Sequence, residues 1–90
     1  MKNPISRAER RAAREERVRR VFGERTQAAL DLLEITELAW HDCYGEITPP
    51  EDIVDDMLAL SEGDLGKLIA AARLALTDWR DLKMQTLARR

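Results

Sequence analysis

Hydrophobic residues recur at steps of three and four along most of the chain, which is the spacing of one face of an α-helix. Between residues 24 and 43 they form a broad apolar face, made of Ala29, Leu32, Leu33, Thr36, Ala39, Trp40 and Cys43 and widened by Leu30, Ile35 and Leu38. Residues 62–87 carry a second stripe, made of Leu65, Leu68, Ile69, Ala72, Ala75, Leu76, Trp79 and Leu82. No segment of the sequence alternates with a period of two, so the pattern predicts an all-α chain.

The N-terminal segment from Arg7 to Val21 is rich in arginine and glutamate and contains neither glycine nor proline. Ser6 followed by Glu9 has the spacing of a capping box, in which two side chains satisfy free backbone N–H groups at the start of a helix. Its apolar positions gather at the C-terminal end and are Val18, Val21 and Phe22. Gly23 then predicts a break or kink. We therefore expect a basic first helix that is anchored by its last turns.

Two further helix starts are indicated by capping residues. Gly45 ends the second helix, and Thr48 as N-cap, with Glu51 three residues later, predicts a short third helix. Ser61 with Asp64 predicts the start of the fourth. The expected fold is all-α: a compact three-helix core plus an Arg-rich N-terminal helix, four helices in total. The basic helix either packs against this core or projects from it.

The net charge of −2 hides an uneven distribution of charge along the chain. Residues 1–25 hold Lys2 and eight arginines against four glutamates, a balance of +5, and the remaining residues sum to −7. We therefore divide the chain into a basic helical arm, residues 1–22, and a helical bundle domain, residues 23–90, with the arm as a separable appendage. Such polarity allows a basic arm to meet an acidic partner, or an acidic body of its own kind.

Five arginines of the arm fall within about a third of the helix circumference at roughly 100° per residue. They are Arg7, Arg10, Arg11, Arg14 and Arg17. This stripe is the candidate partner-binding site, and we interpret the chain as a non-enzymatic helical interaction module that engages an acidic macromolecule, most simply a protein. The stripe could instead follow nucleic-acid phosphates without sequence specificity, or be a solvated face. A membrane surface is disfavoured because the helix lacks a bulky apolar face.

Composition narrows the class of protein further. Ninety residues make one domain at most. Cys43 is the only cysteine, which excludes a disulfide within the chain and a zinc site built from several cysteines. The sequence has no apolar run after its basic N-terminus and none of the ~20 residues that a membrane helix needs. We expect a cytoplasmic protein without catalytic residues, metal or cofactor.

The stretch from Leu32 to Leu82 contains the sequences WHDCYGE, TPPEDI, DDML, AARLA and DWRDL. In these it resembles small uncharacterised helical proteins of high-GC actinobacteria. The resemblance covers somewhat over half of the chain and implies a compact helical domain in a bacterial cytoplasm. It brings no activity and no functional residues across.

A second interpretation starts from carboxylates one helical turn apart. Glu34 and Glu37 share one face of the second helix, and Asp52 and Asp55 share one face of the third. Four such carboxylates could gather around Mg²⁺, which prefers oxygen ligands. The layout is similar to that of the all-α nucleotide pyrophosphatases of the MazG type, which implies a Mg²⁺-dependent nucleotide hydrolase as the alternative function. The sequence departs from that family at position 33, which is Leu where an acidic residue is expected, and at Asp52, which stands in place of Glu.

The single histidine and the single cysteine form a weaker candidate. Glu37 and His41 are four residues apart and could share a metal ion, but His41 and Cys43 point to nearly opposite sides of their helix, which is poor geometry for a catalytic dyad. We expect His41 at the surface near the end of its helix and Cys43 buried as a small hydrophobic residue. Trp40 and Trp79 match the apolar stripes, so we expect both in the core.

The last helix carries Met84 and Leu87 near its C-terminal end. These side chains are expected to extend beyond the shorter helices and to leave an apolar stripe exposed. Such a stripe could pair with a second copy of the chain, so a homo-dimer is one of the partners that the sequence allows.

Overall fold

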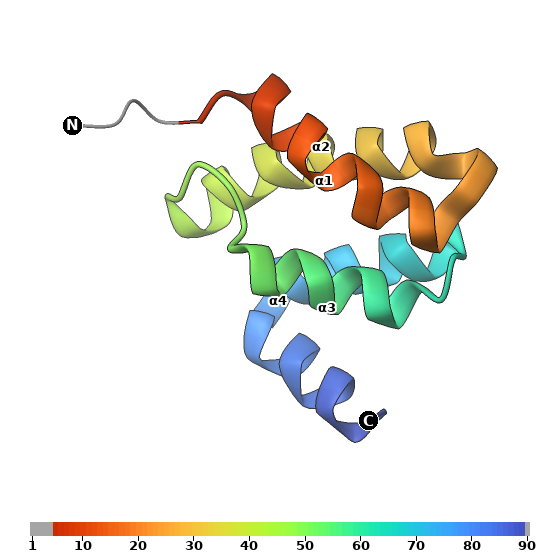
Figure 1. The fold of residues 1–90 in the computed structure, drawn as a ribbon. Helices are drawn as coiled ribbons and strands as arrows, with labels where there is room; N and C mark the ends of the chain where they lie inside the picture. Colours follow the sequence, from red (N-terminus) through yellow and green to blue (C-terminus); the bar gives the residue numbers. More distant parts are fainter. Residues whose placement is uncertain (1–4, 90) are drawn as a thin grey trace.

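The computed structural model describes residues 5–89, and their elements are helices joined by short connections (Figure 1). In chain order these are α1 (Arg7–Phe22), the 3-10 turn η1 (Gly23–Arg25), α2 (Thr26–Tyr44), α3 (Glu51–Ser61) and α4 (Leu65–Ala88). The radius of gyration of the Cα atoms is 12.5 Å, close to the ~12 Å of a compact chain of this length. The prediction of a compact all-α protein is confirmed.

The helices pair as two hairpins that stack on each other. α1 lies against α2, α3 lies against α4, and α2 and α4 join the two pairs. In Figure 1, α1 and α3 form the front of the molecule, and α2 and the first half of α4 lie behind them. The core between them is aliphatic apart from two aromatic side chains. Its residues are Val18, Phe22, Ala29, Leu30, Leu33, Trp40, Ile53, Val54, Met57, Leu58, Leu68, Ala71, Ala72, Ala75 and Leu82.

The first helix packs against the rest of the chain and does not project from it. Ser6 and Glu9 form the expected capping box at its start, and Val18, with no exposed surface, packs in the core. Gly23, with φ 55° and ψ −116°, breaks the α-helix where the chain turns, which confirms the predicted break, and the 3-10 turn η1 then leads directly into α2. Because no gap separates α1, η1 and α2, residues 7–44 count as one helical segment, and the described residues then form three helical segments and not four. The division into an arm, residues 1–22, and a bundle domain, residues 23–90, stays a prediction, and residues 1–4 of the arm lie outside the described residues.

Two capping predictions are wrong, because each predicted cap residue makes a different contact. Pro50, not Thr48, is the residue before α3, because the Thr48 hydroxyl donates a hydrogen bond to Glu37 Oε2 instead (2.7 Å). Ser61 is the last residue of α3, and Asp64 caps α4 by accepting a hydrogen bond from the Lys67 N–H (2.8 Å). In each case a contact made by tertiary packing or by the turn itself outweighs the local spacing rule.

The fourth helix bends near its middle. Asp78 has φ −161° and ψ 104°, which is extended rather than helical backbone. Its carboxylate then accepts a hydrogen bond from the Arg80 N–H (3.0 Å), as a residue at the start of a new helix does. The bend brings Leu82 into the core and sets Lys83 2.8 Å from carboxylate oxygens of Asp52 and Asp56 on α3. The chain end therefore wraps around α3.

Candidate functional site

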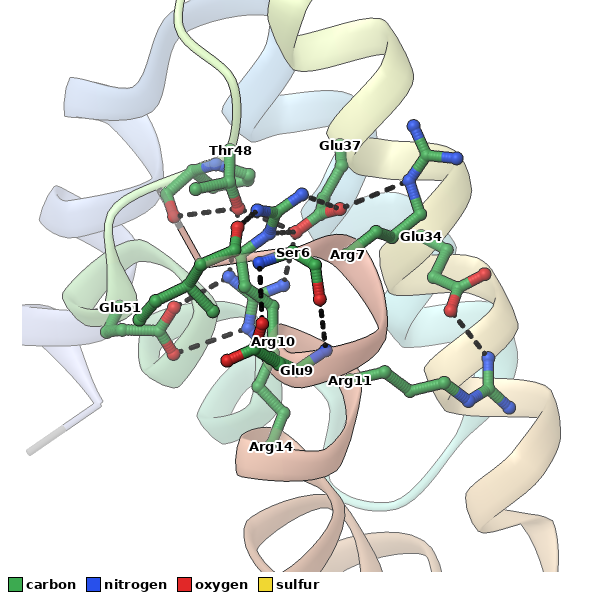
Figure 2. A network of polar contacts seen from close by, with 12 residues as sticks. Ser6, Arg7, Glu9, Arg10, Arg11, Arg14, Glu34, Glu37, Thr48 and Glu51 are labelled. Carbon is green, nitrogen blue, oxygen red and sulfur yellow. Dashed lines mark hydrogen bonds and ion pairs between the residues drawn. The ribbon is translucent and has the colours of Figure 1, made fainter. Parts of the chain in front are cut away.

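The five arginines of the predicted binding stripe face carboxylates of α2 and α3. Figure 2 shows four of them, Arg7, Arg10, Arg11 and Arg14. We call this cluster the arginine network. It consists of Arg7, Arg10, Arg11, Arg14, Arg17, Asp31, Glu34, Glu37, Thr48, Glu51 and Asp55. It links the front helices α1 and α3, whose backbones otherwise approach each other little. The acidic partner of the basic segment is thus, in this structure, the body of the same chain.

Arg14 and Glu37 form the buried centre of the network. Arg14 is 3% exposed and Glu37 is 2% exposed. The Arg14 guanidinium donates to Glu37 Oε2 (2.8 Å), to the Thr48 hydroxyl (3.0 Å) and to both carboxylate oxygens of Glu51 (2.6 and 3.3 Å). Every nitrogen of the guanidinium has a partner, which is the condition under which a charge can be buried.

Glu37 also holds two arginines of the first turns of α1. Arg10 donates to both of its oxygens, at 2.7 and 3.1 Å, in the forked geometry typical of arginine and carboxylate. Arg7 lies 3.9 Å away and stays half-exposed. The contacts of Glu37 explain why α1 follows α2 closely along its length, since the residue lies midway along α2 and reaches three arginines of α1 at once.

The two remaining arginines bind the edges of the network. Arg11 donates to Asp31 (2.7 Å) and lies 3.1 Å from Glu34. Arg17 pairs with Glu51 and with Asp55 on α3. These carboxylates are half-exposed or more except that of Glu34, so the edge pairs stabilise the fold less than the centre does.

The network shifts the acidity of its central carboxylate. Burial alone would raise the pKa of Glu37, but hydrogen bonds from Arg10, Thr48 and Arg14 together outweigh it and hold that pKa below its usual range. The same balance, burial against hydrogen bonds from Arg14 and Arg17, lowers the pKa of Glu51. Both groups are therefore charged at neutral pH and are held as anions rather than poised as proton donors.

The four carboxylates of the alternative metal site are not brought together. Glu37 faces Arg10 and Arg14, Glu34 faces Arg11, Asp55 faces Arg17, and Asp52 is bound by Lys83 at 2.8 Å. Within residues 5–89 no three His, Cys, Asp or Glu side chains are grouped so that they could hold a metal ion. Each carboxylate is instead paired with an arginine of α1 or with Lys83 of α4, and Asp52 and Asp55 face different helices.

The remaining single residues lie apart from one another. Cys43 is exposed, which corrects the expectation that it is buried. Trp40 is buried as expected. Its ring centroid lies 4.3 Å from that of Tyr44 with the planes tilted by 46°, and its indole N–H donates to Glu46 (3.2 Å). Trp79 is 39% exposed, because the bend at the preceding residue turns it outward. Both indoles line an open cleft of about 240 Å³.

An apolar face on the back of the molecule is the feature that the sequence analysis missed. Ile35 of α2 and Ile69 of α4 are 62% and 48% exposed, although both fall on stripes that were expected to be buried. They border a shallow groove of about 330 Å³ between the two helices, together with Ala28, Leu32 and Leu65. We call this surface the α2–α4 face. Asp31 lies at its edge, and its carboxylate is 66% exposed despite the contact with Arg11.

No helix in the described part of the chain has the length and apolarity needed to cross a membrane. The exposed apolar residues are instead spread over helix faces that also carry charge, such as Met84 and Leu87 beside Lys83. Compared with protein-family models, curated proteins and solved structures, the chain matches none of them. Its function is therefore to be inferred from the two surfaces described above, the arginine network and the α2–α4 face.

Proposed function

We propose that this protein is a non-enzymatic helical interaction module that binds a helical surface of another protein chain through its α2–α4 face. The observation that carries the proposal is the exposure of Ile35 and Ile69, two large aliphatic side chains that lie side by side across a groove. Scattered single hydrophobic residues are ordinary on a protein surface, whereas a grooved pair with apolar flanks is typical of a contact surface.

The arginine network has an internal role in this proposal. Four of its arginines, Arg10, Arg11, Arg14 and Arg17, already bind carboxylates of the chain at hydrogen-bond distance. An external acidic macromolecule would have to compete with these contacts, most of which are arranged by the fold. We therefore propose that the arginines of α1 hold this helix against α3, and that the α2–α4 face contacts the partner.

No specific contact favours the two other functions considered. A phosphate-binding surface needs arginines free to meet the backbone of a nucleic acid, and four arginines of the predicted stripe, Arg10, Arg11, Arg14 and Arg17, are already paired with carboxylates of the chain. A Mg²⁺-dependent hydrolase needs carboxylates that converge, and Glu34, Glu37, Asp52 and Asp55 are held by different cations.

The test places a photo-crosslinking residue on the face. Ile35 is replaced by benzoylphenylalanine in the full chain, and cells that express the variant are irradiated. We expect a crosslinked product of higher mass, whereas the same residue at Arg20, an exposed position on α1 at the front, gives little. If the two positions give equal yields, the α2–α4 face is not the contact surface and the proposal fails.

A further inference from the structure

We propose that the cleft lined by Trp40 and Trp79 binds an organic cation, namely an ammonium group that carries a short apolar chain. The cleft is open and has a volume of about 240 Å³, which is smaller than the sites of most drug-sized ligands and suits a group of a few heavy atoms. This inference goes beyond the proposed function, because the cleft and the α2–α4 face are lined by different residues.

Three segments that are far apart in the sequence build the cleft. α2 ends at Gly45, which takes φ 72°, and the chain turns so that Glu46 accepts a hydrogen bond from the Trp40 N–H (3.2 Å). The start of α3 adds a second wall, and the bend of α4 just before Trp79 turns that side chain outward. These three places lie on the same side of the molecule, at the left of Figure 1. The apolar part of the lining consists of Trp40, Pro50, Ile53 and Trp79.

The charged side chains around the cleft carry an excess of negative charge. Glu46 makes no ion pair within residues 5–89, and its hydrogen bond there comes from an uncharged indole. Lys83 lies 2.8 Å from a carboxylate oxygen of Asp52 and 2.8 Å from one of Asp56, so its own charge is more than balanced. Three carboxylates thus surround one ammonium, a balance of −2. This excess attracts a cation and repels an anion.

The helix ends at the cleft are consistent with a cation. α2 ends beside Glu46, and the C-terminal end of a helix carries the negative end of its dipole. α3 begins there with the positive end, but two carboxylates of its first turn, Glu51 and Asp52, offset it. Arg80, next to Trp79 in the sequence, is paired with Asp78 (3.1 Å) and leaves the balance unchanged.

The indoles indicate that the cation is organic rather than a metal ion. Trp79 is 39% exposed and offers its ring to a ligand, while Trp40 and Ile53, each 2% exposed, lie deeper in the cleft. The face of an indole attracts a weakly hydrated cation, and the apolar lining suits a carbon chain attached to it. A neutral apolar ligand would leave Glu46 unpaired. The ammonium group is supplied either by a free amine or by the lysine side chain of another polypeptide.

The experiment is a fluorescence titration of the full chain. Trp40 and Trp79 are its only tryptophans, so their emission reports on the cleft directly. The probes are n-butylammonium chloride and N-acetyl-lysine methylamide, at constant ionic strength. We expect saturable changes with a Kd of roughly 1–10 mM, because few atoms of such a probe are buried. The neutral analogues n-butanol and N-acetyl-norleucine methylamide should bind at least about tenfold more weakly.

Two matched variants separate the charge of Glu46 from charge in general. Glu46→Gln keeps an oxygen that accepts from the Trp40 N–H and should weaken both cations at least about fivefold. Asp42→Asn removes an exposed carboxylate near the end of α2 that does not line the cleft, and should bind like wild type. Trp79→Leu, followed by the emission of Trp40, should bind about threefold more weakly. Circular dichroism checks that each variant is folded.

The outcomes also distinguish the two sources of the ammonium group. Butylammonium that binds at least as tightly as the lysine derivative points to a free amine, and tighter binding of the lysine derivative points to a side chain of another polypeptide. Emission that never saturates, neutral analogues that bind like the cations, or Glu46→Gln that binds like wild type overturns the inference. The crosslinking test at Ile35 concerns a different surface, so either proposal can fail without the other.

Discussion

Replacing Glu37 by Gln tests whether the arginine network stabilises the fold. The change keeps the size of the side chain and removes its charge, while an amide N–H₂ replaces one of the oxygens that accept from arginine. Arg14, which is 3% exposed, then keeps only Glu51 as a charged partner, and Arg10 loses both of its contacts to a carboxylate. The perturbation is therefore confined to the polar centre and leaves the aliphatic core as it was.

The size of the effect follows from the burial of the pair. Removing one member of a buried ion pair costs about 3–5 kcal/mol when the other charge is left alone. Arg14 is not left alone, because Glu51 and Thr48 still accept its hydrogen bonds. We therefore expect a loss of about 2–3 kcal/mol in the free energy of unfolding. For a domain of this size, each kcal/mol lowers the melting temperature by roughly 4–8 °C, so the variant should melt about 8–24 °C lower.

The assay is urea unfolding followed by circular dichroism, with Glu34→Gln as the matched control. Glu34 lies one turn earlier on α2, is 35% exposed and lies 3.1 Å from a single arginine. Its replacement should change the free energy of unfolding by no more than about 0.5 kcal/mol. Equal midpoints for the two variants would refute the reasoning, because the buried centre and the exposed edge would then be worth the same.

Three further outcomes follow from the structure. The pKa of Glu37 is lowered in the folded chain, so its charge stabilises the fold above the unfolded pKa of about 4.3, and this contribution is lost as the pH falls through the folded value. Urea midpoints should therefore fall more between pH 6 and pH 3 for wild type than for Glu37→Gln. Parallel pH curves for the two proteins would contradict this. Gly63→Ala should destabilise the fold by clearly more than the ~1 kcal/mol of a positive φ, since its new Cβ would lie 2.7 Å from the Val21 carbonyl oxygen. Gly45→Ala, at φ 72° in open space, should show the backbone cost alone. Equal losses of melting temperature for the two variants would argue against the close approach. Deleting residues 1–20 removes Val18 from the core and all the arginines of the network, so the remaining chain should lose cooperative melting. A truncated chain that melts like the full one would instead support the interpretation of residues 1–22 as a separable arm.

The helices were predictable from sequence because the apolar spacing that forms them is local. The start of α1 at Ser6 and the end of α2 at Gly45 follow from capping chemistry that involves only nearby residues. The bend at Asp78 was not predictable, since no glycine or proline marks it. It depends instead on α3, against which the end of α4 packs.

The pairing of the arginines of α1 with carboxylates of the same chain could have been predicted in part. The sequence shows a basic segment followed by an acidic one in a chain of only 90 residues, which is the composition of an internal ion cluster as much as of a free arm. That α2 would have an exposed apolar side could also have been predicted. Leu33 and Ile35 are two residues apart and so lie about 200° around the helix from each other, and a single core cannot bury both. Which of the two lies outside depends on the position of α1, which spacing alone does not give.

The connection between Tyr44 and Glu51 is the only place where the chain passes from one hairpin to the other. Each hairpin is made of neighbours in sequence, so each can form on the microsecond scale typical of local helical contacts. Joining the hairpins then requires Glu37, from the first, and Glu51, from the second, to meet around one guanidinium. Arg14 therefore joins the two hairpins. Salt or acid that weakens its ion pairs should slow the docking of the two hairpins more than the formation of each hairpin.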